Sequence, residues 1–119
     1  MLDPKITAAL AEIEQLEDVR SALSSKLKAR RDEARKSKDR ATAQALTDQI
    51  TQLAQKNLHL VLAKRRLYRA VPLQSLVDEL SVLSLQAKDL VRAVATTAEI
   101  LKAAHKLLQI LIKVGALTK

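Results

Sequence analysis

The chain has 119 residues, which is enough for one domain and too few for two ordinary ones. Tyr68 is its only aromatic residue, so any core must be aliphatic, and the absence of cysteine excludes disulfides and thiolate metal sites. The 21 lysines and arginines outnumber the 13 acidic residues, an excess that favours an acidic partner, nucleic acid or anionic lipid without selecting among them.

The composition favours helices along the whole chain. Alanine, leucine and other strong helix formers dominate, whereas glycine occurs once and proline twice. The first residues lack the pattern of a secretory signal, and no apolar stretch approaches the roughly 20 residues that span a bilayer. We therefore expect an all-α protein located in the cytoplasm.

A first helix is predicted for residues 4–35. Asp3 can cap the free amides of the first turn, and Pro4 suits the first helical position, where an amide would have no partner. Apolar residues then recur at spacings of three and four, as in the seam of a coiled coil. They are Ile6, Ala9, Ile13, Leu16, Leu23 and Leu27.

A second helix is predicted for residues 40–70, with an equally regular seam. The first seam, continued forward, would reach residues 41 and 48, but the second uses residues 43 and 50. Coiled coils accommodate insertions of three or four residues rather than two, so a break in the polar run Lys36–Arg40 explains the offset better. We predict an antiparallel hairpin that turns there. The alternative is one uninterrupted helix, which no glycine or proline forbids.

A polar residue interrupts the second seam at Asn57. Such residues often fix the register or the oligomeric state of helices at some cost in stability. We therefore interpret Asn57 as a candidate register-setting residue. Lys64, in the same seam, has a side chain long enough to reach solvent past the seam edge.

A third helix is predicted for residues 73–114. Pro72 ends the second helix, because a proline disfavours helical geometry at the preceding residue, and it can open the third. The third seam continues from Leu73 to Leu111, with its weakest point at Thr96 and Thr97, and Gly115 is a candidate C-terminal cap. The predicted fold is an elongated, coiled-coil-like three-helix bundle, formed as a single domain by residues 1–119.

The third predicted helix is longer than the second, so its C-terminal end should project past the hairpin. That end is apolar on more than one face, and a surface of this kind seldom stays uncovered. We expect it to contact an oligomer partner, another protein or a membrane surface. The predicted contact residues are Leu101, Leu107, Leu108, Ile110, Leu111, Ile112 and Val114.

Basic residues cluster in two segments, residues 26–40 and residues 64–69. Nucleic acid would be bound through phosphates, but single-strand binders also use aromatic platforms, and only Tyr68 is available. A solvated, charge-rich helix surface is the simpler interpretation. The candidate basic residues are Lys28, Arg30, Arg31, Arg35, Lys36, Lys38, Arg40, Arg65, Arg66 and Arg69.

No residue pattern indicates catalysis. His59 and His105 belong to different predicted helices, which argues against a shared metal, and the nearby carboxylates of Glu14, Glu17 and Asp18 fit a solvated face. Neither a phosphate-binding glycine loop nor a nucleophile beside a base is present. We therefore expect no catalytic residue, metal, cofactor or small-molecule substrate.

The sequence as a whole favours a non-catalytic helical interaction or assembly protein. Its long C-terminal helix would self-associate or bind a protein partner. The alternative is a membrane-acting amphipathic helical protein, such as a component of a pore-forming system, that hides its apolar C-terminal segment until it meets lipid. A basic nucleic-acid-associated bundle is the third hypothesis.

Overall fold

The computed structural model describes residues 3–92 and 94–119. Its helices are α1 (Pro4–Lys36), α2 (Arg40–Leu67), α3 (Gln74–Arg92) and α4 (Thr97–Leu117). The all-α fold class is confirmed, since these two ranges contain no strand. The predicted number of helices is wrong, because the segment expected to form one third helix forms two.

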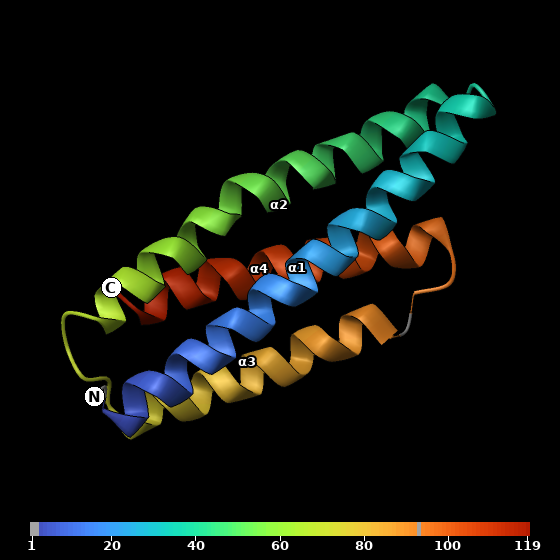
Figure 1. The fold of residues 1–119 in the computed structure, drawn as a ribbon. Coiled ribbons are helices and arrows are strands. Elements are labelled where there is room, and N and C mark those ends of the chain that lie inside the picture. Colours follow the sequence, from blue (N-terminus) through green and yellow to red (C-terminus); the bar gives the residue numbers. More distant parts are fainter. Residues whose placement is uncertain (1–2, 93) are drawn as a thin grey trace.

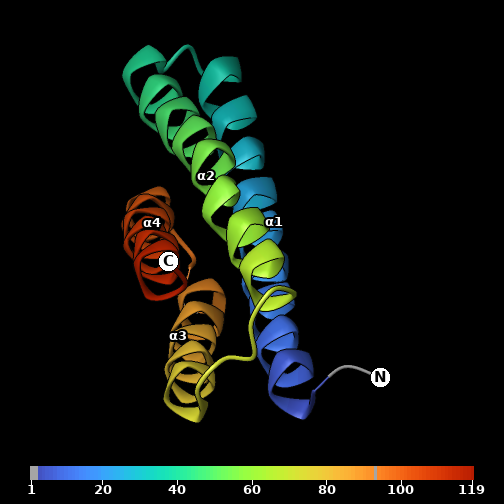
Figure 2. The same ribbon diagram turned by 90° about the vertical axis from the view of Figure 1, so that its left-hand side faces the viewer.

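The four helices form an elongated bundle of 53 × 23 × 22 Å made of two antiparallel hairpins. Figure 2 shows α1 and α2 side by side in one layer, with α3 lying against α1 and α4 against α2 in the other. The α3–α4 seam is more loosely packed than the α1–α2, α1–α3 and α2–α4 seams. The second hairpin is therefore held mainly by the first.

The turn between α1 and α2 lies within the polar run Lys36–Arg40. Lys38 has a left-handed backbone, with φ of 61°, and reverses the chain. Asp39 caps α2 by accepting hydrogen bonds from the Thr42 amide at 3.1 Å and the Thr42 hydroxyl at 2.7 Å. The bond from the hydroxyl, followed by that from the amide, lowers the pKa of Asp39 below its ordinary value of 3.8.

The chain turns again between α3 and α4, where one continuous helix was expected. α3 ends at Arg92, Ala93 lies outside the described residues, and Thr96 caps α4 by accepting a hydrogen bond from the Glu99 amide at 3.2 Å. The Thr96 hydroxyl also bonds the Glu99 carboxylate at 3.1 Å. Thr96 followed by Glu99 has the sequence spacing of a capping box, and the bond from the Glu99 amide to the Thr96 hydroxyl caps the start of a new helix.

Burial explains why the chain folds back there. A single helix would leave the C-terminal segment uncovered beyond the first hairpin, whereas α4 instead contacts α1, α2 and α3. Each leucine or isoleucine that becomes fully buried contributes roughly 1.5–3 kcal/mol. The predicted overhang of the C-terminal end is thus wrong: the tip of the α1–α2 hairpin projects past the second hairpin instead (Figure 1).

The core follows the predicted seams closely. All six seam residues of α1 are buried, and so are Ala43, Leu46, Leu53, Leu60 and Leu67 of α2. Leu73, predicted to open the third seam, is exposed because α3 begins one residue later, at Gln74. Gly115 is not a cap, since α4 continues to Leu117.

Candidate interaction surfaces

The predicted C-terminal contact residues lie mostly inside the bundle. Leu107, Leu108, Ile110, Leu111 and Val114 are buried, Leu101 is half-buried, and Ile112 is 41% exposed. The uncovered overhang that motivated this contact surface does not exist, because α4 buries these side chains against the other helices. Only the outward flank of α4 is available to a partner.

A groove follows the loosely packed seam between α3 and α4. Three adjoining hollows of about 280, 420 and 340 Å³ share Gln86, Asp89, Leu90 or Lys106 with their neighbours. The groove is therefore continuous from the start of α4 to its last turn. Its apolar lining includes Val82, Leu83, Leu90, Val94, Ala103, Ile110 and Leu117.

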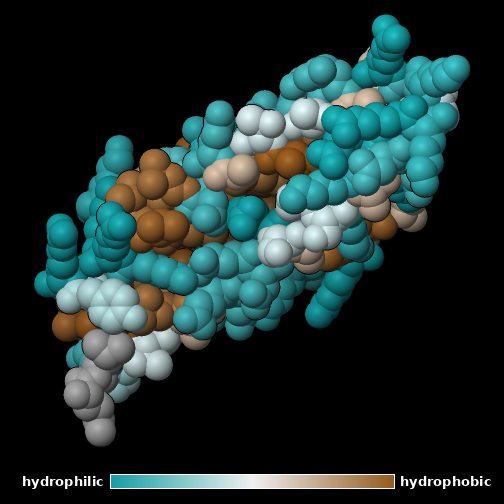
Figure 3. Space-filling model, turned by 45° about the horizontal axis from the view of Figure 1, so that its top comes forward, coloured by the Kyte–Doolittle hydropathy of each residue, from teal (hydrophilic) through white to brown (hydrophobic). Residues whose placement is uncertain are grey.

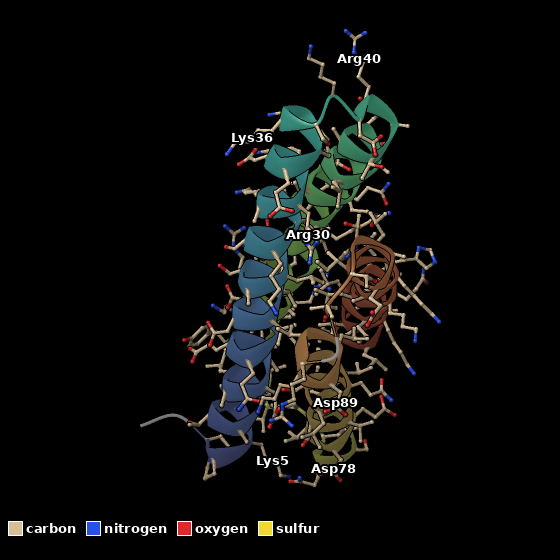
Figure 4. All side chains as sticks on the ribbon, turned by 90° about the vertical axis from the view of Figure 1, so that its right-hand side faces the viewer. Lys5, Arg30, Lys36, Arg40, Asp78 and Asp89 are labelled. Carbon is tan, nitrogen blue, oxygen red and sulfur yellow. The ribbon has the colours of Figure 1, made fainter. Side chains whose placement is uncertain are left out.

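The two edges of this groove carry opposite charges. The α3 edge contributes Asp78, Glu79 and Asp89, whereas the α4 edge contributes Lys102, Lys106 and Lys113, with Glu99 as the one acidic residue at its start. Within the described residues, no ion pair joins one edge to the other. Val82 and Leu85 add apolar surface on α3, being 53% and 59% exposed. Figure 4 shows Asp78 and Asp89 along α3, away from the basic hairpin tip.

The ten basic candidates do not form one patch. Those of residues 28–40 lie along the projecting end of the α1–α2 hairpin, where Lys36 and Arg40 point into solvent (Figure 4). Arg65 and Arg66 lie in the last turn of α2 and Arg69 just beyond it, at the opposite end of the hairpin. The structure therefore offers two separate basic surfaces, neither long enough to form a continuous basic track along the molecule.

Two basic side chains of α1 have a structural role at the end of α3. The Arg30 guanidinium donates to the carbonyl oxygen of Ala95 at 2.6 Å, and the Lys26 ammonium donates to that of Val91 at 3.3 Å. Free carbonyls and partial negative charge gather at a helix C-terminus, so cations are stabilising there. Arg30 is thus engaged in holding the turn between α3 and α4.

Polar contacts between the helices are few, and some buried polar atoms lack a partner. Ser84 of α3 donates to the side-chain oxygen of Gln15 on α1 at 2.7 Å. Asn57 is half-buried in α2, and its side-chain oxygen has no hydrogen-bond partner among the described residues. A buried oxygen without a partner lowers the stability of the fold. This agrees with the interpretation of Asn57 as a residue that sets the register of the helices, and that interpretation stays a prediction.

Lys64 and Glu17 form an ion pair across the α1–α2 seam. The hydrogen bond to Glu17 is the main cause that raises the pKa of Lys64 above 10.5, with the charges of Glu17 and Glu14 adding to it. Burial opposes this shift more weakly. The lysine predicted to reach solvent past the seam is therefore held by a carboxylate of the neighbouring helix.

His59 and His105 do not share a site. His59 packs against Gly115 of α4, where a Cβ would clash with the imidazole ring, whereas His105 is exposed on α4. Over residues 3–92 and 94–119, no group of histidine and acidic side chains has the arrangement of a metal site. None of the four described helices is long and apolar enough to cross a membrane.

No family model matches the sequence, and comparisons with curated proteins and with solved structures gave no match. The functional argument therefore rests on the surfaces described above.

Proposed function

We propose that this chain is a non-catalytic interaction protein that pairs with a second copy of itself through the α3–α4 groove. The observation that carries this proposal is the opposite charge of the two groove edges, with an apolar floor between them. A two-fold axis parallel to the groove would bring α3 of one copy against α4 of the other at the same height. Each acidic edge would then meet a basic edge.

The positions of the charges support this arrangement in detail. Asp78 and Glu79 line the same hollow as Lys113, and Asp89 lines the two hollows that also contain Lys106. Residues that share a hollow within one copy come to face each other between two copies related by that axis. Complementary charge of this kind selects a partner and its register more than it adds affinity.

The apolar surface supplies the driving force for pairing. Val82 and Leu85 are more than half exposed, and the groove floor is aliphatic. Surfaces of paired proteins combine an apolar centre with a polar rim in this way. An assembly role of this type needs neither cofactor nor substrate.

Charge reversal gives a direct test. One variant carries Lys106→Glu and Lys113→Glu, and a second carries Asp78→Lys, Glu79→Lys and Asp89→Lys. Each alone would place like charges across the two-fold interface, so sedimentation should show association weakened by roughly tenfold or more. Mixed together, the two variants should form a heterodimer, because every reversed edge then meets an oppositely reversed edge.

A matched control reverses charges outside the groove. Lys36→Glu with Arg40→Glu changes the net charge as much as the first groove variant, but at the hairpin tip, and should leave pairing intact. Circular dichroism should show that all variants remain helical. A wild-type chain that stays monomeric at all concentrations, or reversed variants that do not recover on mixing, would contradict the proposal.

A further inference from the structure

The loop between α2 and α3 exposes apolar side chains to an extent that no other loop in the described residues matches. Tyr68 is 62%, Val71 53% and Leu73 74% exposed, all within six consecutive residues. The neighbouring Leu67 and Pro72 are buried and anchor the loop to the bundle. The loop that carries the three exposed side chains lies at one end of the elongated molecule (Figure 1).

Positive charge surrounds these side chains. The segment from Lys64 to Leu73 contains four basic residues and no acidic one. Lys64 is paired with Glu17, but Arg65 and Arg69 are exposed and, among the described residues, have no ion-pair partner. The nearest acidic residues along the chain, Asp78 and Glu79, line the α3–α4 groove instead. The loop is thus both apolar and basic.

Apolar and basic side chains also line one cavity at this end of the molecule. A cavity of about 380 Å³ opens behind the loop, and its lining includes Arg66, Arg69, Val71 and Leu76. Figure 3 shows further apolar side chains gathered over the part of the molecule where α2 ends, between hydrophilic ones. On α2, exposed Leu58 and half-buried Leu62 supply apolar surface before the loop.

We propose that the α2–α3 loop, residues 68–73, is a contact site for an anionic lipid bilayer. Val71 and Leu73 enter the boundary between headgroups and acyl chains, Tyr68 lies at the headgroup level, and Arg65 and Arg69 bind lipid phosphates. Tyrosine favours this interface because its ring is apolar and its hydroxyl is polar. Basic residues beside an apolar segment are attracted to anionic headgroups.

The shape of the loop favours a membrane over other acidic partners. Its apolar side chains are exposed to solvent, as insertion into a bilayer requires, whereas an acidic peptide would need a groove of matching length. Single-stranded nucleic acid uses several aromatic platforms, and Tyr68 is the only aromatic residue in the chain. Residues 68–73 line none of the hollows of the groove proposed for self-pairing, so either proposal can fail alone.

The single aromatic residue provides a probe without any label. Because Tyr68 lies in the loop and the chain has no tryptophan, all intrinsic fluorescence reports on the proposed contact. Vesicles of phosphatidylcholine mixed with phosphatidylserine should float the full-length protein and protect Tyr68 from quenching by acrylamide. Vesicles of phosphatidylcholine alone should bind far less, because the arginines then meet no net negative charge.

Matched substitutions separate the loop from general attraction of a basic protein to vesicles. Arg69→Gln should weaken binding by about fivefold, whereas Arg40→Gln at the opposite end should not change it. Leu73→Gln should weaken binding to anionic vesicles, whereas Ile112→Gln, at an exposed position on α4 outside the loop and the groove, should not. Each substituted side chain is exposed in the bundle, so all four variants should stay folded.

Three outcomes would overturn this inference. The first is flotation that Arg40→Gln reduces as much as Arg69→Gln, which would indicate attraction by net charge alone. The second is vesicle binding with Tyr68 still fully accessible to acrylamide. The third is a Tyr68 response to inorganic phosphate or RNA without any flotation, which would assign the loop to a soluble anion.

Discussion

The two hairpins of the bundle are stabilised in different ways. α1 and α2 contact each other closely, with leucines such as Leu16 and Leu53 fully buried and the Lys64–Glu17 ion pair at one edge. α3 and α4 contact α1 and α2 more than they contact each other, and leave an open groove between them. The second hairpin is therefore held in place mainly by the first hairpin. The seam between α3 and α4 remains an open groove.

The largest expected effect comes from the core of the first hairpin. Leu53→Ala should lower the free energy of unfolding by about 2–5 kcal/mol, because it removes buried contacts and leaves a cavity in a close-packed seam. Leu90→Ala, in the half-buried lining of the α3–α4 groove, should cost clearly less. Urea unfolding of both variants at a concentration where the chain is monomeric measures the difference. Equal costs would mean that the two seams are packed alike.

The contact between α2 and α4 at Gly115 should show a smaller effect. Gly115→Ala would place a methyl group against the ring of His59 and should cost about 1–3 kcal/mol of unfolding free energy. In a His59→Ala background the clash disappears. The same substitution should then be neutral or stabilise by up to about 1 kcal/mol, since alanine favours helices more than glycine. Thermal unfolding of the four chains in this cycle provides the test, and an identical effect in both backgrounds would disprove the contact.

The cap that separates α3 from α4 is expected to contribute less. Thr96→Ala removes the acceptor for the Glu99 amide and should destabilise the chain by about 1 kcal/mol. Thr96→Ser keeps the hydroxyl and serves as the control, with little change expected. Hydrogen exchange of the amides in the first turn of α4 should increase in the alanine variant only. Unchanged exchange there would indicate that tertiary packing alone starts α4.

The smallest effect concerns the ion pair at the edge of the first hairpin. Glu17→Gln should lower the free energy of unfolding at neutral pH by about 0.5 kcal/mol, because both side chains are partly exposed to solvent. The pKa of Lys64 is raised in the folded state, so this contribution is complete below pH 10.5 and is lost as the pH rises through the folded-state pKa. The gap between wild type and variant should accordingly close at strongly alkaline pH. A gap that persists there would have a cause other than charge.

The sequence predicted the turn between α1 and α2. It did not predict the turn between α3 and α4, and the reasons can be identified. A register offset between 41 and 43, together with a polar run, indicated the first turn. At the second, the apolar register continued from Leu90 through Val94 and Thr97 to Leu101, which resembles one helix. The signal that could have revealed the break was Thr96 followed by Glu99, the pattern of a capping box.

The groove could not be predicted from the sequence. Its edges come from two helices that were expected to be one, and on a single continuous helix Asp89 and Lys106 would lie at distant heights rather than on opposite sides of a groove. The loop residues Tyr68, Val71 and Leu73 were missed for a related reason, since Val71 and Leu73 matched the spacing of buried seams. Only their position outside both helices leaves them in solvent.

The sequence by itself determined the helical class, the start of α1 at Asp3 and Pro4, the turn after Lys36 and the seams that form most of the core. These features depend on local propensity, caps and apolar periodicity, which act between residues close in the chain. Only the tertiary structure decided that α4 folds back onto α2 and that the C-terminal leucines and isoleucines become core. That choice depends on which surfaces are left to bury once the first hairpin has formed, a property of the whole bundle rather than of any segment.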